Sequence, residues 1–226
     1  MIKQVTPIET YPIKGKTIYV KREDLCTEYP LPPLAKMRGV YQRLLKVKEQ
    51  GITHVGVFDT KVSVAGYGVG TMAKMLGMEC TTYYAKLKEG ESQNIKLAAE
   101  VGEICGVKPG RTPICYVFAK RHAEANDTYM MPQGLACNET TDAVAEVASA
   151  IPQELLTGSL VICAGTGTIL SGLIKGLPLM PQVYSISACI SPEKQRRNIT
   201  KLVNDISRFF SSLRHNRKSI KFWCKS

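Results

Sequence analysis

The sequence lacks the features of membrane and secreted proteins. Its 226 residues contain no run of about 18 apolar residues, and the start, Met1-Ile2-Lys3-Gln4, shows neither the basic nor the apolar region of a signal peptide. No C-x-x-C pair occurs, and the eight cysteines are scattered, several of them inside apolar runs. We therefore expect a cytoplasmic protein with buried, reduced thiols, without a membrane or metal partner. Disulfides or a zinc site are the alternative.

Acidic residues are scarce relative to basic ones, with 19 Asp and Glu against 30 Lys and Arg and a net charge of +11. Residues 191–226 hold much of this excess, because only Glu193 and Asp205 oppose the basic side chains Lys194, Arg196, Arg197, Lys201, Arg208, Arg214, Arg217, Lys218, Lys221 and Lys225. Such a basic tail can follow nucleic-acid phosphates, and Phe222 and Trp223 could stack on bases. A solvated helix face and packed aromatic side chains are the alternative.

Apolar residues make up 44% of the chain, enough for a substantial core, and their spacing alternates between the periods of strands and helices. Strands are predicted at 53–58, 80–85, 114–119, 160–163 and 183–190. Helices are predicted at 40–50, 65–77, 91–101 and 142–150, and a further helix is predicted to begin within 171–176. This alternation predicts an α/β protein with parallel sheets flanked by helices and right-handed crossovers.

Lys36 is the first candidate for chemistry. It lies in Pro32-Pro33-Leu34-Ala35-Lys36-Met37-Arg38, downstream of the extended run Ile18–Leu25, which ends in Lys21-Arg22-Glu23-Asp24-Leu25. The positive end of a helix dipole disfavours a protonated lysine, and a neutral, rigidly held amine suits covalent catalysis on a carbonyl. Arg38 follows by two positions on another helix face, so we expect it to pair with a carboxylate.

The second chemical feature is a strand that runs through Gly165-Thr166-Gly167-Thr168 into a helix. Backbone N–H groups and threonine hydroxyls converge there, where the helix dipole favours an anion, so the loop is a good phosphate cradle. A tight structural turn or a nucleotide site would look similar. The loop is no Walker motif, because Gly-Lys-Ser/Thr is absent. Gly172 is expected to allow close packing of the helix.

Together these segments resemble the fold-type-II pyridoxal-phosphate enzymes, which have the tryptophan synthase β-like fold. They are most similar to the branch of aminocyclopropane-carboxylate deaminase and D-cysteine desulfhydrase. The resemblance covers roughly residues 5–190. It is carried by Thr6-Pro7-Ile8-Glu9, Lys21–Leu25, the Lys36 motif, Val57–Ser63, Ala73–Met78, Met131-Pro132-Gln133-Gly134, Ala143–Val147 and Gly165–Thr168.

This resemblance implies pyridoxal 5'-phosphate as cofactor, bound to Lys36 as a Schiff base. The cofactor phosphate is then expected at Gly165, Thr166, Gly167 and Thr168. Ser63 keeps the hydroxyl of the family's Ser-Asn-His loop, and Lys36 or Ser63 is expected to move the proton. The asparagine and histidine of that loop are replaced by Val64 and Ala65, and the family's glycine-rich Asn-Lys motif is replaced by Leu34-Ala35-Lys36.

The resemblance further implies two regions. Residues 1–190 form the catalytic α/β region, made of two interleaved subdomains of which the smaller lies at roughly 52–130. Residues 191–226 form the basic tail, because the family's C-terminal third is largely absent. A homodimer is possible.

The shortening and the charge make the chain similar to reduced pyridoxal-phosphate enzymes of bacteriophages that hypermodify thymidine. We therefore expect an enzyme that decarboxylates an amino acid such as glycine attached to the thymine methyl group in viral DNA, in the host cytoplasm. One alternative is a small-molecule deaminase or desulfhydrase acting on D-cysteine or aminocyclopropane carboxylate. A second is an inactive binding module that keeps the fold.

Overall fold

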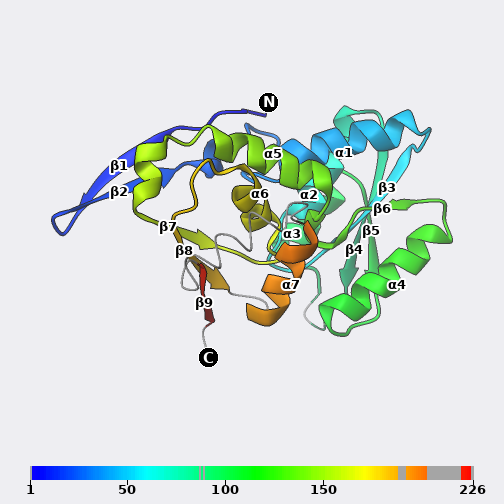
Figure 1. Ribbon diagram of the computed structural model, residues 1–226. Coiled ribbons are helices and arrows are strands. Elements are labelled where there is room, and N and C mark those ends of the chain that lie inside the picture. Colours follow the sequence, from blue (N-terminus) through cyan, green and yellow to red (C-terminus); the bar gives the residue numbers. More distant parts are fainter. Residues whose placement is uncertain (1, 87, 89, 188–191, 203–219, 225–226) are drawn as a thin grey trace. The chain divides into compact units, whose positions relative to one another are not determined.

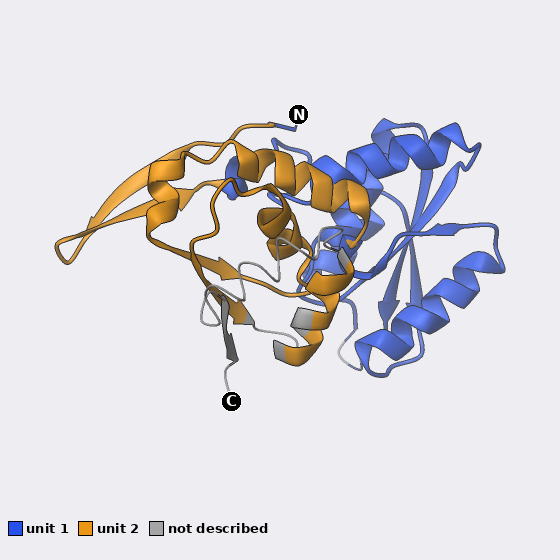
Figure 2. Ribbon diagram, in the orientation of Figure 1, with its two compact units in different colours: residues 1–3, 23–135 blue, residues 4–22, 136–226 orange. Residues whose placement is uncertain are grey.

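The computed structural model describes residues 2–86, 88, 90–187, 192–202 and 220–224, and its elements are shown in Figure 1. The chain divides into two compact units (Figure 2). Unit 1 contains residues 1–3 and 23–135, and unit 2 contains residues 4–22 and 136–226. Each unit has its own parallel sheet and its own buried cores.

Unit 1 is built on a four-stranded parallel sheet in the order β5-β4-β3-β6. Its strands are β3 (His54–Asp59), β4 (Glu79–Ala85), β5 (Glu103–Val107) and β6 (Tyr129–Met130). In the register, Val55 lies opposite both Cys80 and Tyr129. The chain adds β4 and β5 on one side of β3 and then returns to the other side with β6. The switch point therefore lies between β3 and β6, and in open parallel sheets ligands bind beyond the carboxyl ends at such a point.

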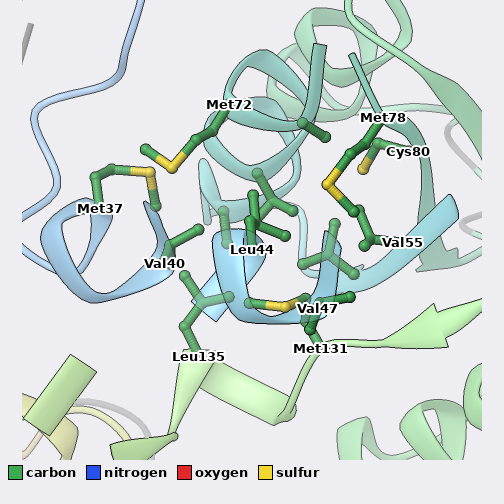
Figure 3. Packing of buried hydrophobic residues seen from close by; sticks show 14 of the residues in the cluster. Met37, Val40, Leu44, Val47, Val55, Met72, Met78, Cys80, Met131 and Leu135 are labelled. Carbon is green, nitrogen blue, oxygen red and sulfur yellow. The ribbon is translucent and has the colours of Figure 1, made fainter. Parts of the chain in front are cut away.

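The helices of unit 1 cover both faces of this sheet. They are α1 (Met37–Glu49), α2 (Ala65–Met75), α3 (Gln93–Ala99) and α4 (Thr112–Glu124), and the short 3-10 turns η1 (Glu23–Leu25) and η2 (Gln133–Leu135) precede and follow them. Right-handed crossovers place α2 and α3 on one face and α4 on the other, since the chain reverses its direction across the sheet after β5. Val55, labelled in Figure 3, and Val57 pack with α1 and α2, whereas Phe58 packs with α4.

One predicted strand is wrong, because residues 114–119 belong to helix α4. Pro113 stands in its first turn, where its fixed φ suits a helix. The buried side chains recur every four residues, at Cys115, Ala119 and Ala123. The apolar residues that produced the strand pattern, Ile114, Val117 and Phe118, are exposed on the other side of the helix. The remaining predicted helices and strands are present, most with shifted ends, and residues 188–190 of the last predicted strand lie outside the described residues. The prediction missed β5 and β6.

Unit 2 combines a hairpin with a second parallel sheet. The hairpin pairs β1 (Ile8–Ile13) with β2 (Lys16–Lys21) in antiparallel register and was not predicted. The three-stranded sheet has the order β7 (Ser159–Cys163), β8 (Gln182–Ser187) and β9 (Ile220–Cys224). Its helices are α5 (Asn138–Ser149), α6 (Thr168–Gly176) and α7 (Pro192–Leu202), with the 3-10 turn η3 (Gln153–Thr157) after α5. Buried Leu170, Ile174, Val183 and Ile199 join α6, α7 and the sheet in one core.

Helices α5 and α6 approach each other backbone to backbone. A Cβ atom on Gly172 would lie 2.5 Å from the Cβ of Val144, and one on Gly176 would lie 2.0 Å from the carbonyl oxygen of Ala145. Only glycine fits at these positions. The predicted role of Gly172 in close helix packing is therefore confirmed, and this packing fixes the direction of α6.

Several sequence expectations concern the thiols and the tail. Among the described residues six cysteines are free thiols, and four of these, Cys26, Cys80, Cys115 and Cys137, are buried as expected. No helix in the described ranges is both long enough and apolar enough to cross a membrane. Within the basic tail, Arg208, Arg214, Arg217, Lys218 and Lys225 lie outside the described residues, as do the side chains of Arg196, Lys221, Phe222 and Trp223.

Candidate functional site

Lys36 stands at the start of α1, as its sequence context predicted. It is the N-cap residue, with φ −64° and ψ −18°, and its side chain is half-buried. The Nζ atom donates a hydrogen bond to the carbonyl oxygen of Gly134 at 2.7 Å. Lys36 and Gly134 are 98 residues apart in the chain, and the fold of unit 1 brings them together.

The segment that carries Gly134 follows β6 at the switch point of the sheet. Gly134 has φ 67° and Leu135 has φ 56°, so two successive residues adopt the left-handed conformation. For a leucine this conformation costs about 1–2 kcal/mol. It persists because the Leu135 side chain is buried against α1, where Figure 3 shows it pointing toward Val40. The Gly134 carbonyl is thereby fixed next to Lys36, a contact that sequence reasoning missed.

An ion pair between a buried arginine and a half-buried glutamate holds the first turn of α1. Arg38 Nη1 lies 2.5 Å from Glu23 Oε2, and Arg38 Nε donates to the carbonyl oxygen of Lys3 at 2.8 Å. The Arg38 side chain is 1% exposed and the Glu23 side chain 31%. The prediction that Arg38 pairs with a carboxylate is confirmed. Met37, the residue after Lys36, is buried in the unit 1 core. The helix turn that follows Lys36 is therefore held both by this burial and by the Arg38–Glu23 ion pair.

Ser63 lies in the loop between β3 and α2. Its Oγ atom accepts a hydrogen bond from the N–H group of Ala65 at 3.1 Å, and its own N–H group donates to the carbonyl oxygen of Thr60 at 3.1 Å. The hydroxyl is half-buried and helps to hold the first residue of α2. Val64, which follows it, offers no polar side chain.

Asp59, the last residue of β3, is a buried carboxylate next to this loop that sequence reasoning missed. It is 1% exposed, and its oxygens accept hydrogen bonds from the N–H groups of Gly66 at 2.6 Å and of Thr60 at 2.8 Å. Burial raises the pKa of Asp59, and the hydrogen bonds from Ser63, Gly66 and Thr60 oppose that rise. A carboxylate at a helix start is favoured by the dipole. The available signal was an aspartate directly after a buried strand and before a helix.

In unit 2 the predicted phosphate loop joins β7 to α6. Gly167 adopts φ 95° as the N-cap residue, and the hydroxyls of Thr166 and Thr168 lie 3.0 Å apart. Asn198 of α7 donates to the carbonyl oxygen of Thr166 at 3.0 Å, and Ser171 Oγ donates to that of Gly167 at 2.9 Å. Gly165 is exposed, and no described atom lies within 4 Å of the position of a Cβ there. The hydrogen bonds from Asn198 and Ser171 therefore hold the loop, and there is free space beside Gly165.

Comparison with known proteins agrees with this architecture. A homologue of aminocyclopropane-carboxylate (ACC) deaminase has a TM-score of 0.76 with 17% identity, over 97% of this chain and 71% of its own. A hydrogen sulfide-producing enzyme from Fusobacterium nucleatum has a TM-score of 0.63 with 19% identity, over 84% of this chain and 65% of its own. The chain has the fold of the type-II pyridoxal-phosphate enzymes. The predicted fold class is thus confirmed.

The chain is also similar in sequence to a phage enzyme. The chain is 35% identical over 185 residues to a glycyl-dTMP PLP-dependent decarboxylase of Pseudomonas phage M6, and the match covers 78% of this chain. It spans 66% of that relative, just under two thirds of its length. No protein-family model matches the chain. The resemblance to a phage enzyme of modified thymidine nucleotides, which the sequence predicted, is confirmed.

Within the type-II fold, the predicted site residues divide between the two units. Lys36 and Ser63 belong to unit 1, and both stand at helix starts. Gly165, Thr166, Gly167 and Thr168 belong to unit 2, at the carboxyl end of β7. Unit 1 therefore carries the candidate amine, and unit 2 carries the uncharged loop that was predicted to bind a phosphate.

Proposed function

We propose that the protein is a pyridoxal-phosphate-dependent decarboxylase that acts on a glycyl group attached to the thymine methyl group in viral DNA. The observation that carries the proposal is the 35% identity with the phage glycyl-dTMP decarboxylase. The retained Lys36 and the retained loop Gly165–Thr168 support it, because they are the two parts that such a cofactor requires.

The residues present fit pyridoxal phosphate. The loop Gly165–Thr168 offers two hydroxyls and the positive end of the nine-residue helix α6 to a phosphate group. The open space at Gly165 is space that a Cβ atom would fill. Lys36 supplies an amine on a rigid helix start, suited to covalent attachment of an aldehyde.

When bound, the cofactor supplies an electron sink for the pair left by the departing carboxylate. In the reaction the bond between the α-carbon and the carboxylate breaks, carbon dioxide leaves, and a proton is added to the α-carbon. We assign that proton transfer to the Lys36 amine, with the Ser63 hydroxyl as the second candidate. The carbonyl of Gly134 would orient the Lys36 amine through the hydrogen bond at 2.7 Å.

Charge supports a nucleic-acid substrate. The net charge of +11 is favourable for attraction to DNA phosphates, and Lys194, Arg197 and Lys201 are carried on α7. We propose that the protein acts in the cytoplasm of the infected host cell, where viral DNA is made. A homodimer stays a prediction from the family resemblance.

The decisive experiment is turnover of DNA that carries glycyl-modified thymidine. The purified protein, with pyridoxal phosphate added, is incubated with this DNA, and the digested nucleosides are analysed by mass spectrometry for loss of carbon dioxide. We expect turnover by the parent protein and a loss of about 1,000-fold or more in Lys36→Ala, because covalent attachment and proton transfer both need the amine. Lys74→Ala, an exposed lysine near the end of α2, is the matched control.

A second readout separates cofactor binding from turnover. Borohydride reduction followed by peptide mass spectrometry is expected to place the cofactor on Lys36 in the parent and to give no stable adduct in Lys36→Ala. Turnover of free D-cysteine or aminocyclopropane carboxylate, without turnover of modified DNA, would replace the proposal with the small-molecule alternative. If the parent, like Lys36→Ala, gives neither a stable cofactor adduct nor turnover, the alternative of an inactive binding module is favoured.

A further inference from the structure

A cavity of about 140 Å³ lies at the carboxyl edge of the unit 1 sheet, and neither Lys36 nor Ser63 is among its lining residues. Its lining includes Lys61 after β3, Tyr84 in β4, Ser92 before α3, and Thr112 at the start of α4. These residues lie at or beyond the carboxyl ends of β3, β4 and β5. The cavity is thus at the edge of a parallel sheet where ligands bind.

The loops around this cavity are rich in exposed basic side chains. Lys61 lines the cavity, and the other four flank its lining in the sequence: Lys86, Lys88, Lys108 and Arg111. None of the five forms a salt bridge with another residue in the described ranges of the chain. We call these five residues the basic rim.

Two carboxylates of the described chain, Asp59 and Glu91, line the cavity, and both are engaged locally. Asp59 is buried and accepts hydrogen bonds from the N–H groups of Thr60 and Gly66. Glu91 accepts a hydrogen bond from the hydroxyl of Tyr84 at 2.7 Å. At the opposite, amino edge of the same sheet, basic and acidic residues are mixed. There, Lys46, Lys48 and Lys74 are interspersed with Glu49, Glu79, Glu100 and Glu103.

Two donors in the cavity wall also favour an anion. The Ser92 hydroxyl is buried and has no hydrogen-bond partner among the residues that the structure describes. A buried polar group left in this state costs about 1–3 kcal/mol, which a ligand acceptor would recover. Thr112 begins the 13-residue helix α4, which no described side chain caps. The side chain of its N-cap residue, Arg111, therefore makes no hydrogen bond to the positive end of the helix dipole.

We propose that the basic rim and the cavity that Lys61 lines bind a backbone phosphate of the DNA strand that carries the target thymidine. This phosphate site is distinct from Gly165–Thr168, which lies in unit 2. The identity of the strand rests on the proposed function, whereas the affinity for phosphate rests on the charges and donors of this edge. Lys61 lies two residues before Ser63 in the loop between β3 and α2, so the phosphate site and the candidate catalytic loop share one segment.

The test is binding of unmodified duplex DNA, followed by fluorescence anisotropy at several salt concentrations. For each DNA phosphate that a variant no longer neutralises, the slope of log K against log salt becomes shallower by about 0.9. We expect Lys108→Gln/Arg111→Gln to reduce the slope by about 1–2 and to weaken binding roughly tenfold or more at about 0.1 M salt. Lys86→Gln/Lys88→Gln is expected to act in the same direction.

The matched control removes the same charge from the other edge of unit 1. Lys74→Gln/Lys120→Gln changes two exposed lysines near the ends of α2 and α4, and we expect affinity within about twofold of the parent. Equal slopes in the parent and the rim variants would overturn the proposal. So would an equal reduction in the control, because it would show a general effect of charge.

Two further arms identify the ligand and keep the proposals separate. Thymidine 5'-monophosphate is titrated into the parent and the rim variants. Binding of this nucleotide that depends on the rim, with unchanged DNA binding, would assign the cavity to a free nucleotide and overturn the DNA site. DNA binding needs no turnover. A rim-dependent slope without decarboxylation therefore overturns the proposed function alone, and decarboxylation with equal slopes overturns the phosphate site alone.

Discussion

Two strand–loop–helix segments, one in each unit, differ in what lies at the start of the helix. Between β3 and α2, the protein places its own buried carboxylate, Asp59, against the N–H group of Gly66. Between β7 and α6, the loop Gly165–Thr168 brings hydroxyls and backbone but no charge. The start of α2 is therefore closed by the protein itself, whereas the start of α6 is suited to an anion from outside. The two helix starts thus differ by one charged side chain, which is present at α2 and absent at α6.

The start of α1 is a third case, because it carries a basic side chain, Lys36. A protonated lysine at the positive end of a helix dipole is unfavourable. Lys36 is held there by the Gly134 carbonyl and by a helix turn that the Arg38–Glu23 pair anchors. The positions of these three helix starts thus depend on different interactions, and substitutions can test each one.

The largest effect is expected where α6 is held against α5. In Gly176→Ala the new methyl group would lie 2.0 Å from a backbone oxygen, so the helices must separate. We expect a decrease of about 3 kcal/mol or more in the free energy of unfolding, measured by urea denaturation. Gly158→Ala is the control, because no described atom lies within 4 Å of its Cβ position. A decrease below about 1 kcal/mol in Gly176→Ala would show that the packing of α5 on α6 does not hold α6 in place.

The next effect concerns the start of α1. Glu23→Gln leaves the buried Arg38 guanidinium without its carboxylate, and breaking a buried pair costs about 3–5 kcal/mol. Because Glu23 is partly exposed, we expect a value near about 3 kcal/mol by urea denaturation. Glu28→Gln removes a carboxylate from the exposed pair with Lys3 and is expected to cost less than about 1 kcal/mol. Similar costs for both variants would contradict the anchoring role of the Arg38–Glu23 pair.

A smaller effect is expected from a substitution in the loop before α6, and it tests whether the start of α6, unlike that of α2, binds an external anion. In Gly165→Ala the methyl group enters open space, so the free energy of unfolding should change by less than about 0.5 kcal/mol. The same methyl group would occupy space that we assign to the cofactor phosphate. We expect binding of pyridoxal phosphate, followed by absorbance, to weaken about tenfold, which is about 1.4 kcal/mol. Unchanged cofactor affinity would argue against phosphate binding at this loop.

The smallest effect is a pH dependence at the start of α2. The pKa of Asp59 is raised by burial, so between the unfolded and folded pKa values the native state binds more protons than the unfolded state. The stability of the parent relative to Asp59→Asn should therefore fall as pH rises from about 4 through the folded pKa. Urea denaturation at several pH values measures this difference. If the stability of the parent relative to Asp59→Asn instead rises with pH, the sign assigned to the pKa shift is wrong. Asp127→Asn is the control for the removal of an exposed charge.

Much of the architecture could be predicted because it depends on local patterns. Apolar runs bounded by glycine predicted β3, β7 and the helices that follow them, since period and turn residues act over a few positions. The strand predicted at 114–119 was wrong because a short apolar run does not distinguish a strand from a helix. The decisive signal was Pro113 in the first turn, together with the small residues at every fourth position.

The sequence by itself determined which chemical groups the protein has: the amine of Lys36, the Gly-Thr loop before α6, and the excess of basic residues. The tertiary structure decided what these groups contact. It placed the Gly134 carbonyl at Lys36, paired Arg38 with Glu23, and buried Asp59 at the start of α2. Such contacts join residues that the chain order does not pair. They depend on the packing of whole elements, which no local pattern encodes.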